Sequence, residues 1–145
     1  MALPVLILVQ LWRLARADLI AHGRAPQGLV ERFVLLAGQH LHDHRGIGDY
    51  AAMLGVSRDR LGRAARRTTG LSPQAYLHQL LIREASELLA STGMQVGQLA
   101  FRLGFSEPAY FTRFFTRQRG ESPAQFRRAA RARRARGDQS YADWP

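Results

Sequence analysis

Apolar residues after residue 28 recur at helical spacing in five stretches, which turn-forming residues separate from one another. No segment alternates apolar and polar residues for long enough to favour a sheet, so the pattern predicts an all-α fold. The first expected helix covers Leu29 to about His42 and follows the Gly- and Pro-containing linker HGRAPQG. A short helix from Asp49 to Leu54 then ends at Gly55, and Ser57 is placed to cap a second helix that runs to about Thr69.

A longer helix is predicted from Pro73 to Ser91, where apolar residues form a broad face. Ser72 is its expected N-cap, and Pro73 fits the first turn because its missing N–H would find no partner there. Gly93 is expected to stop the helix. Its 19 residues, at about 1.5 Å each, would make a spacer roughly 28 Å long.

The chain repeats itself at a period of 49 to 50 residues. Three small residues recur 49 positions later, with Ala51, Gly55 and Ser57 matched by Ala100, Gly104 and Ser106. Six further residues recur 50 positions later: Leu61, Arg63, Gly70, Ser72, Pro73 and Tyr76 are matched by Phe111, Arg113, Gly120, Ser122, Pro123 and Phe126. The one-residue change in the period is expected inside the second helix of each unit. Two copies in register indicate a duplicated supersecondary unit.

Each copy has the parts of a helix-turn-helix unit: a small alanine for close packing, a glycine for the turn, and a serine that caps an arginine-bearing second helix. We therefore predict two such units, at about 29–71 and 94–128, joined by a linker helix over 72–92. The second helices would enter two adjacent major grooves of DNA, which are about 34 Å apart, and bending of the duplex would absorb any mismatch. The expected helix caps are Ser57, Ser72, Ser106 and Ser122.

The composition favours a polyanionic partner. The formal net charge is +10, and all 21 basic residues are arginine, whose planar fork suits phosphates and base edges. Nucleic acid is the first expectation and an anionic membrane surface the second. The apolar start at residues 2–12 is too short to span a bilayer, and no membrane partner is expected. The chain has no cysteine, which excludes disulfides, thiolate metal sites and cysteine nucleophiles.

The second helix of the first unit supplies the first set of candidate DNA contacts. Its expected exposed positions are Arg58, Asp59, Gly62, Arg63, Arg66 and Arg67. Arg63 is the best candidate for a bidentate bond to guanine. Asp59 would either accept a hydrogen bond from a cytosine amino group or orient Arg63, which lies four residues further along the helix.

The second unit has comparable positions. These are Glu107, Pro108, Ala109, Thr112 and Arg113, while Arg117 and Arg119 are expected to reach phosphates. Arg113 is expected to read a base. Phe111, Phe114 and Phe115 lie at helical spacing, so they are expected in the core rather than as stacking platforms for bases.

Residues 98–127, QLAFRLGFSEPAYFTRFFTRQRGESPAQFR, carry a specific motif. They contain Ala100, Gly104-Phe105, Phe111, Arg113, Phe115, Gly120, Pro123 and Phe126-Arg127, as does the AraC/XylS family of bacterial transcription regulators. The stretch from Leu29 to Arg128 resembles the C-terminal DNA-binding domain of that family. The resemblance implies a cytoplasmic, nucleoid-associated protein that binds double-stranded promoter DNA through two helix-turn-helix units and activates transcription through contact with RNA polymerase.

The first unit departs from the family's usual sequence. Ala65 stands where the family has a phenylalanine, and Leu81 stands where its linker helix has an arginine. Gly62 lies inside the expected recognition helix, where glycine costs about 1 kcal/mol relative to alanine. We therefore expect the first unit to be more loosely packed than the second.

The two ends of the chain lie outside the matched region. Residues 1–28 resemble the last helix of the family's effector and dimerisation domain, and their apolar surface predicts a homodimer; packing back on the core is the alternative. Residues 129–145 form an arginine-rich tail that is expected to add non-specific affinity for DNA.

Other interpretations have less support. His40, Asp43 and His44 fall within reach of one helix face, but histidines near a helix C-terminus are more often solvated, so neither a metal nor a cofactor is expected. An alkyl-accepting repair enzyme would need a cysteine, and the capping serines lack a histidine at motif spacing, so no enzymatic activity is expected. The main alternative is a non-specific, arginine-rich architectural or RNA-binding protein, which would bind random duplexes as well as any selected site.

Overall fold

A computed structural model of the chain describes residues 28–142, with side chains described as far as residue 137. Its elements are α2 (Leu29–His40), the 3-10 helix η1 (Leu41–Asp43), α3 (Ile47–Leu54), α4 (Arg58–Thr69), α5 (Pro73–Ser91), α6 (Val96–Arg102), α7 (Pro108–Arg119) and α8 (Pro123–Ala142). No strand occurs in this range, so the all-α prediction is confirmed, with seven α-helices where the apolar pattern indicated five stretches. The N-terminal helix expected within residues 1–28 lies outside the described residues.

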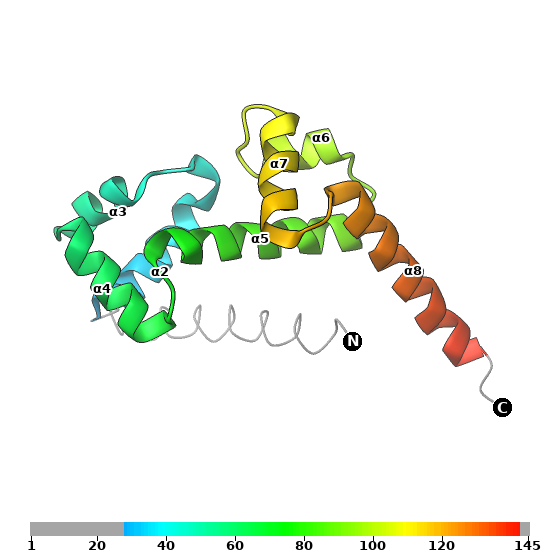
Figure 1. The fold of residues 1–145 in the computed structure, drawn as a ribbon, viewed down its shortest axis with the longest axis horizontal. Coiled ribbons are helices and arrows are strands. Elements are labelled where there is room, and N and C mark those ends of the chain that lie inside the picture. Colours follow the sequence, from blue (N-terminus) through cyan, green and yellow to red (C-terminus); the bar gives the residue numbers. More distant parts are fainter. Residues whose placement is uncertain (1–27, 143–145) are drawn as a thin grey trace.

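The long helix α5 forms the axis of the fold (Figure 1). Helices α2, α3 and α4 gather at its N-terminal end, and α6, α7 and α8 gather at its C-terminal end. Each group contains a short helix, a glycine turn and a second helix, so the predicted pair of helix-turn-helix units on a linker helix is confirmed. Within the described range, no helix has both the length and the apolar character that crossing a membrane requires.

Each unit has its own hydrophobic core, and both cores share one face of α5. This face is a stripe of residues four apart, Leu77, Leu81, Ala85 and Leu89, all of them buried. Leu77 belongs to the first core and the other three to the second. Leu81 continues the apolar stripe, which explains why a leucine is acceptable where an arginine was expected.

The first unit has a hydrophobic core of its own, and its looser packing relative to the second unit stays a prediction. Ala65 is fully buried. Aromatic bulk comes instead from Phe33 of α2, whose ring lies 5.5 Å from that of Tyr50 and 5.7 Å from that of Tyr76. A small side chain on α4 therefore suits a core that α2 fills from the other side.

Three of the four predicted serine caps form. The backbone N–H groups of Arg60, Ala75 and Gln125 donate to the hydroxyls of Ser57, Ser72 and Ser122, at 3.1, 3.2 and 3.1 Å. The Ser122 N–H also donates to the side chain of Gln125 at 2.9 Å, which completes a reciprocal capping box.

The prediction that Ser106 caps the second recognition helix was wrong. Glu107 occupies the N-cap position of α7 without a side-chain cap, and Pro108 takes the first helical position. The one-residue change in the repeat was predicted inside the second helix of each unit, and this was also wrong, because α4 and α7 both have 12 residues. The additional residue lies in the turn between Gly104 and α7, and it moves Ser106 one position too far from the helix to cap it.

Two other boundaries differ from expectation, and that of α5 does not. Helix α3 begins at Ile47, because Asp49 sits in its first turn and accepts a hydrogen bond from the N–H of Gly46 at 3.1 Å. Helix α5 has the predicted bounds, Pro73–Ser91, and its C-cap is Thr92, whose hydroxyl donates to the carbonyl of Leu88 at 2.6 Å. The first helix is α-helical as far as His40 and continues as η1.

Helix α8 extends through the arginine-rich segment that was expected to be a separate tail from residue 129. Its first turns pack on α5, where the Arg127 Nε donates to the carbonyl of Leu89 at 3.0 Å, and burial lowers the pKa of this guanidinium. Further along, residues 131–137 are exposed, and the helix projects away from the two units (Figure 1).

Candidate nucleic-acid interface

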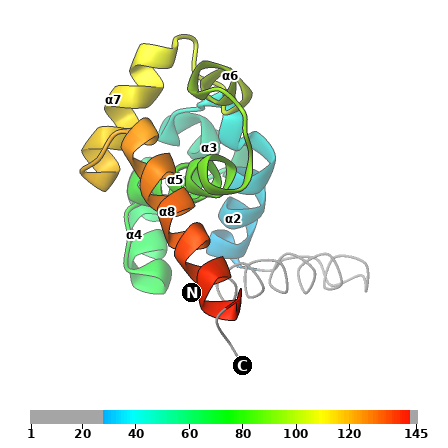
Figure 2. The same ribbon diagram turned by 90° about the vertical axis from the view of Figure 1, so that its right-hand side faces the viewer.

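The second helices of the two units, α4 and α7, lie on the same side of α5, while α2 and α6 lie on the other side (Figure 2). The 19 residues of α5, on which both units pack, make a helix roughly 28 Å long at about 1.5 Å per residue. The arrangement presents two arginine-bearing helices on one face, as the sequence predicted for a pair of recognition helices.

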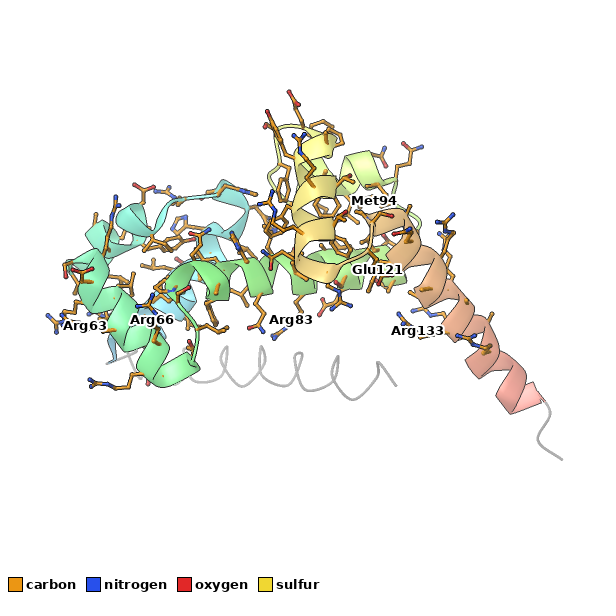
Figure 3. The ribbon with its side chains drawn as sticks, viewed as in Figure 1. Arg63, Arg66, Arg83, Met94, Glu121 and Arg133 are labelled. Atoms are coloured by element: carbon orange, nitrogen blue, oxygen red, sulfur yellow. The ribbon has the colours of Figure 1, made fainter. Side chains whose placement is uncertain are left out.

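On α4, four of the five predicted contact residues line one groove. Arg58, Asp59, Arg63 and Arg66 all face it, and the first residues of α5 form its opposite wall. Arg67 is exposed but does not line this groove. Figure 3 marks Arg63 and Arg66 on α4, and both side chains are exposed. Guanidinium groups beside the N-terminal end of a helix create a positive surface suited to a polyanion.

Two details of α4 were not visible in the sequence. The guanidinium of Arg58 lies over Gly48 of α3, where a Cβ would come within 2.8 Å of the Arg58 Cζ, so the missing side chain leaves room for the arginine. Gly62 was expected to be exposed and is buried, because its neighbours cover a residue that has no side chain of its own.

Asp59 does not orient Arg63. Over the described residues, the structure contains no ion pair or hydrogen bond between these side chains, and both are exposed. Of the two roles considered for Asp59, the structure therefore disfavours the intrahelical one.

On α7, most of the predicted residues lie in the N-terminal half of the helix, and Arg117 lies in its last turn. Pro108, Ala109, Arg113 and Arg117 are exposed, as is the N-cap Glu107, and Thr112 is half-buried. Phe111 and Phe115 are fully buried, and the half-buried Phe114 packs against that core, so the expectation that these rings are structural is confirmed.

Tyr110 was not predicted as part of this surface. Its side chain is 49% exposed, and its ring lies 5.1 Å from the Arg113 Cζ, which is a cation–π contact. The stacked tyrosine limits the directions in which the arginine points. An aromatic residue three positions before an arginine on a helix was the signal that sequence reasoning missed.

Comparison with known proteins adds to this geometry. A family model described as a helix-turn-helix domain matches residues 50–129, more than half of the chain. The DNA-binding domain of AdpA, a global transcriptional factor, was solved in complex with a target DNA; it is 36% identical, with a TM-score of 0.65 over 74% of this chain and 96% of that one. This chain belongs to the AraC family.

Two further AraC-family proteins show how much of this chain is matched and at what sequence identity. The transcriptional activator RhaR of Klebsiella pneumoniae is 38% identical over 78 residues, which are 54% of this chain and 28% of RhaR. An AraC-type regulator from Chromobacterium violaceum has the same fold, with a TM-score of 0.61 at 24% identity over 70% of this chain and 91% of that one. The AraC-family chain spans at most 36% of the length of the first curated relatives that it matches.

Replacing Gly62 by alanine is expected to stabilise this AraC-family domain by up to about 1 kcal/mol, because alanine is the better helix former. A Cβ at this position would meet only the Arg66 Nη1, at an ordinary distance of 3.7 Å. Urea unfolding of the two proteins measures the difference. Gly55→Ala is the control, because its φ of +68° makes any side chain unfavourable, and that variant should lose stability. A Gly62→Ala protein less stable than the original would contradict the expectation.

The side chains of His40, Asp43 and His44 in the AraC-family chain do not meet at a common site. The His40 Nδ1 and the Asp43 carboxylate lie 2.9 Å apart, and this contact is the main reason that the pKa of Asp43 is lowered below its ordinary 3.8. The His44 Nε2 instead donates to the carbonyl of Leu103 at 2.9 Å. Among the residues that the structure describes, no group of three histidine or acidic side chains is placed to hold a metal.

His78 makes the stability of the AraC-family domain depend on pH. Burial lowers its pKa below the ordinary 6.5, and the nearby Arg117 and His44 side chains lower it further. The unfolded chain therefore binds a proton below pH 6.5 that the folded chain does not, so the free energy of unfolding should decrease as pH falls below that value. Urea unfolding at a series of pH values tests this. His78→Gln should reduce the slope just below pH 6.5, and an unchanged slope would rule out this histidine as its source.

Proposed function

We propose that this chain is the DNA-binding part of a sequence-specific transcription regulator, and that it reads two adjacent major-groove segments of double-stranded promoter DNA. The duplication carries the proposal: α4 and α7 are second helices of equivalent units, both present exposed arginines, and both lie on one side of α5. The AdpA domain, solved with its target DNA, supports this interpretation.

We assign the contacts by position on the two helices. Arg63 and Arg113 occupy equivalent positions in the repeat and would read base edges, with Asp59 accepting a hydrogen bond from a cytosine amino group. Arg58, Arg66 and Arg67 on α4, and Arg117 on α7, would hold phosphates. The remaining surface at the start of α7, formed by Glu107, Pro108, Ala109 and Thr112, would line the second groove.

The roles of a complete regulator follow by analogy. RhaR is named as a transcriptional activator, and we propose activation through contact with RNA polymerase for this chain as well. Residues 1–28 would support a homodimer through their apolar surface. A regulator of this kind would work at the nucleoid, in the cytoplasm.

A non-specific nucleic-acid binder is the second candidate, because α8 carries the exposed arginines 131, 133, 134 and 136 outside both units. Such a helix would attract any duplex through its phosphates. Sequence selectivity distinguishes the two candidates, since phosphate contacts alone do not discriminate between sequences.

Selection of binding sites from random duplex DNA tests the proposal directly. The purified chain is used at near-physiological salt, because low salt strengthens phosphate contacts of every sequence. We expect two short boxes about one helical turn apart. A single enriched box would mean that one of the two units does not read bases. Absence of enrichment, together with tight binding to random DNA, would favour the non-specific candidate.

A further inference from the structure

The connection between α2 and α3 reaches over α5 and meets the turn that precedes α7 (Figure 1). We infer that this contact, which we call the junction, fixes the two recognition helices relative to each other, so that the chain accepts only one spacing between its two DNA boxes. His42 and His44 form the junction on one side, and Leu103, Gly104 and Phe105 form it on the other. The inference rests on the proposed function.

At Gly104 the backbones of the two units touch. A Cβ on this glycine would overlap the carbonyl oxygen of His42 and lie 2.8 Å from the carbonyl carbon. Gly104 also has a φ of +89°. Gly55, its counterpart in the first unit, has a similar φ of +68°, yet a Cβ there would meet nothing within 4 Å. Of the two equivalent turns, the second one is therefore closed by the other unit.

His44 holds the opposite side of the junction in place. Its backbone has a φ of +51°, which a residue other than glycine seldom adopts without support from its surroundings. The support comes from the second unit: the Nε2 donates to the carbonyl of Leu103 at 2.9 Å, and the ring meets the ring of Phe105 edge-on, 4.6 Å between centroids. The strained residue and the turn that it contacts lie 59 positions apart in sequence.

The junction is tied to α5 as well. The His42 Nε2 lies 2.9 Å from a carboxylate oxygen of Glu84, and Leu41 packs against the cores of both units. On the α7 side, His78 of α5 stacks edge-on against Phe114 at 5.1 Å. The two units therefore contact each other as well as α5. Because of these additional contacts, bending or twisting of α5 alone does not change the position of one unit relative to the other.

A fixed arrangement has a direct consequence for DNA. One added base pair moves the second box by about 3.4 Å along the duplex and turns it by roughly 35° around the axis. A rigid pair of helices cannot follow both changes. A flexible pair would keep most of its affinity, because each unit would still reach its own box.

The first test compares duplexes that carry the selected boxes at the selected spacing and at one base pair more or less. The original chain should lose at least about tenfold in affinity when the spacing changes. His44→Asn keeps a residue type that accepts a left-handed backbone but removes the ring, and it should reduce this loss to about threefold or less. Affinity for a single box should stay within about twofold, which separates the junction from the base contacts.

The two glycines provide a matched pair for the same test. Gly104→Ala should weaken the spacing preference, whereas Gly55→Ala, which has the same backbone requirement without the close contact, should keep it. An original chain that binds all three spacings equally would overturn the inference, as would a His44→Asn protein with the original preference. If Gly104→Ala does not fold, the spacing preference of the His44→Asn protein decides whether the inference stands.

A measurement without DNA keeps the inference separate from the proposed function. The chain has no cysteine, so Thr68→Cys on α4 and Thr116→Cys on α7, both exposed, allow attachment of two spin labels. The distance distribution between the labels should be narrow in the original background and broader with His44→Asn. Equal widths would overturn the inference. A narrow distribution in a chain that selects no DNA sequence would leave the junction standing and remove the proposed function.

Discussion

Replacing Phe115 by alanine is expected to lower the free energy of unfolding by about 3–5 kcal/mol, more than any other single change considered for this domain. The side chain is fully buried, and its ring lies 5.8 Å from that of Phe111 and 5.6 Å from that of Phe126. Alanine would leave a cavity between α7 and α8 that neighbouring helices fill only in part. Urea denaturation followed by circular dichroism measures the loss.

Phe101→Ala is the matched control for this prediction. The Phe101 side chain, on α6 of the same unit, is 57% exposed, so its removal should change stability by less than about 0.5 kcal/mol. Similar losses for both variants would mean that Phe115 has no special place in the core. Loss of the second unit alone, with a first unit that still unfolds cooperatively, would show that the two cores unfold independently although both pack on α5.

The second large effect is expected in DNA binding. Arg113→Ala should weaken binding to the cognate site by about 1–3 kcal/mol and relax the preference at one base position. Arg113 is exposed on α7 and stacked on Tyr110, so under the proposed function its truncation removes a base contact from a side chain that the tyrosine already holds in place. Quantitative binding to the cognate duplex and to its single-base variants checks both parts of the prediction.

An arginine outside the two units serves as the comparison. Arg134 lies on the exposed part of α8, and Arg134→Ala should weaken cognate and random duplexes slightly and to the same extent. If Arg113→Ala also weakened all duplexes equally, its assigned role in reading a base would be wrong. A fall in the salt dependence of binding, without a change in base preference, would point to a phosphate contact instead.

The sequence predicted the architecture because its signals are local and occur twice. Glycine in a turn, serine before a helix and proline in a first turn each report a backbone conformation of their own neighbourhood. The wrong prediction for Ser106 arose from following the repeat at one offset past the turn. Pro108 indicates the correct boundary, because proline is favoured at the first position of a helix and the N-cap is then the preceding residue, Glu107.

Packing between distant segments was not predictable in the same way. Ala65 suggested a defect in the first unit, but nothing in the sequence shows that Phe33 of another helix supplies the aromatic bulk there. The contact of His44 with Leu103 likewise joins residues 59 positions apart. Arg67 is exposed as expected but lies outside the groove, whose opposite wall belongs to α5 and was not predictable from α4 alone.

The tandem order of the two units gives the molecule a direction. α4 and α7 carry different side chains, and the first unit is completed by the helix that precedes it while the second is completed by the helix that follows, α8. A single chain of this kind has no twofold axis, so it does not call for a palindrome in the DNA that it binds. If the chain regulates transcription as proposed, turning its binding site end for end would reverse the direction in which α8 points along the DNA, and the orientation of the site would matter as well as its sequence.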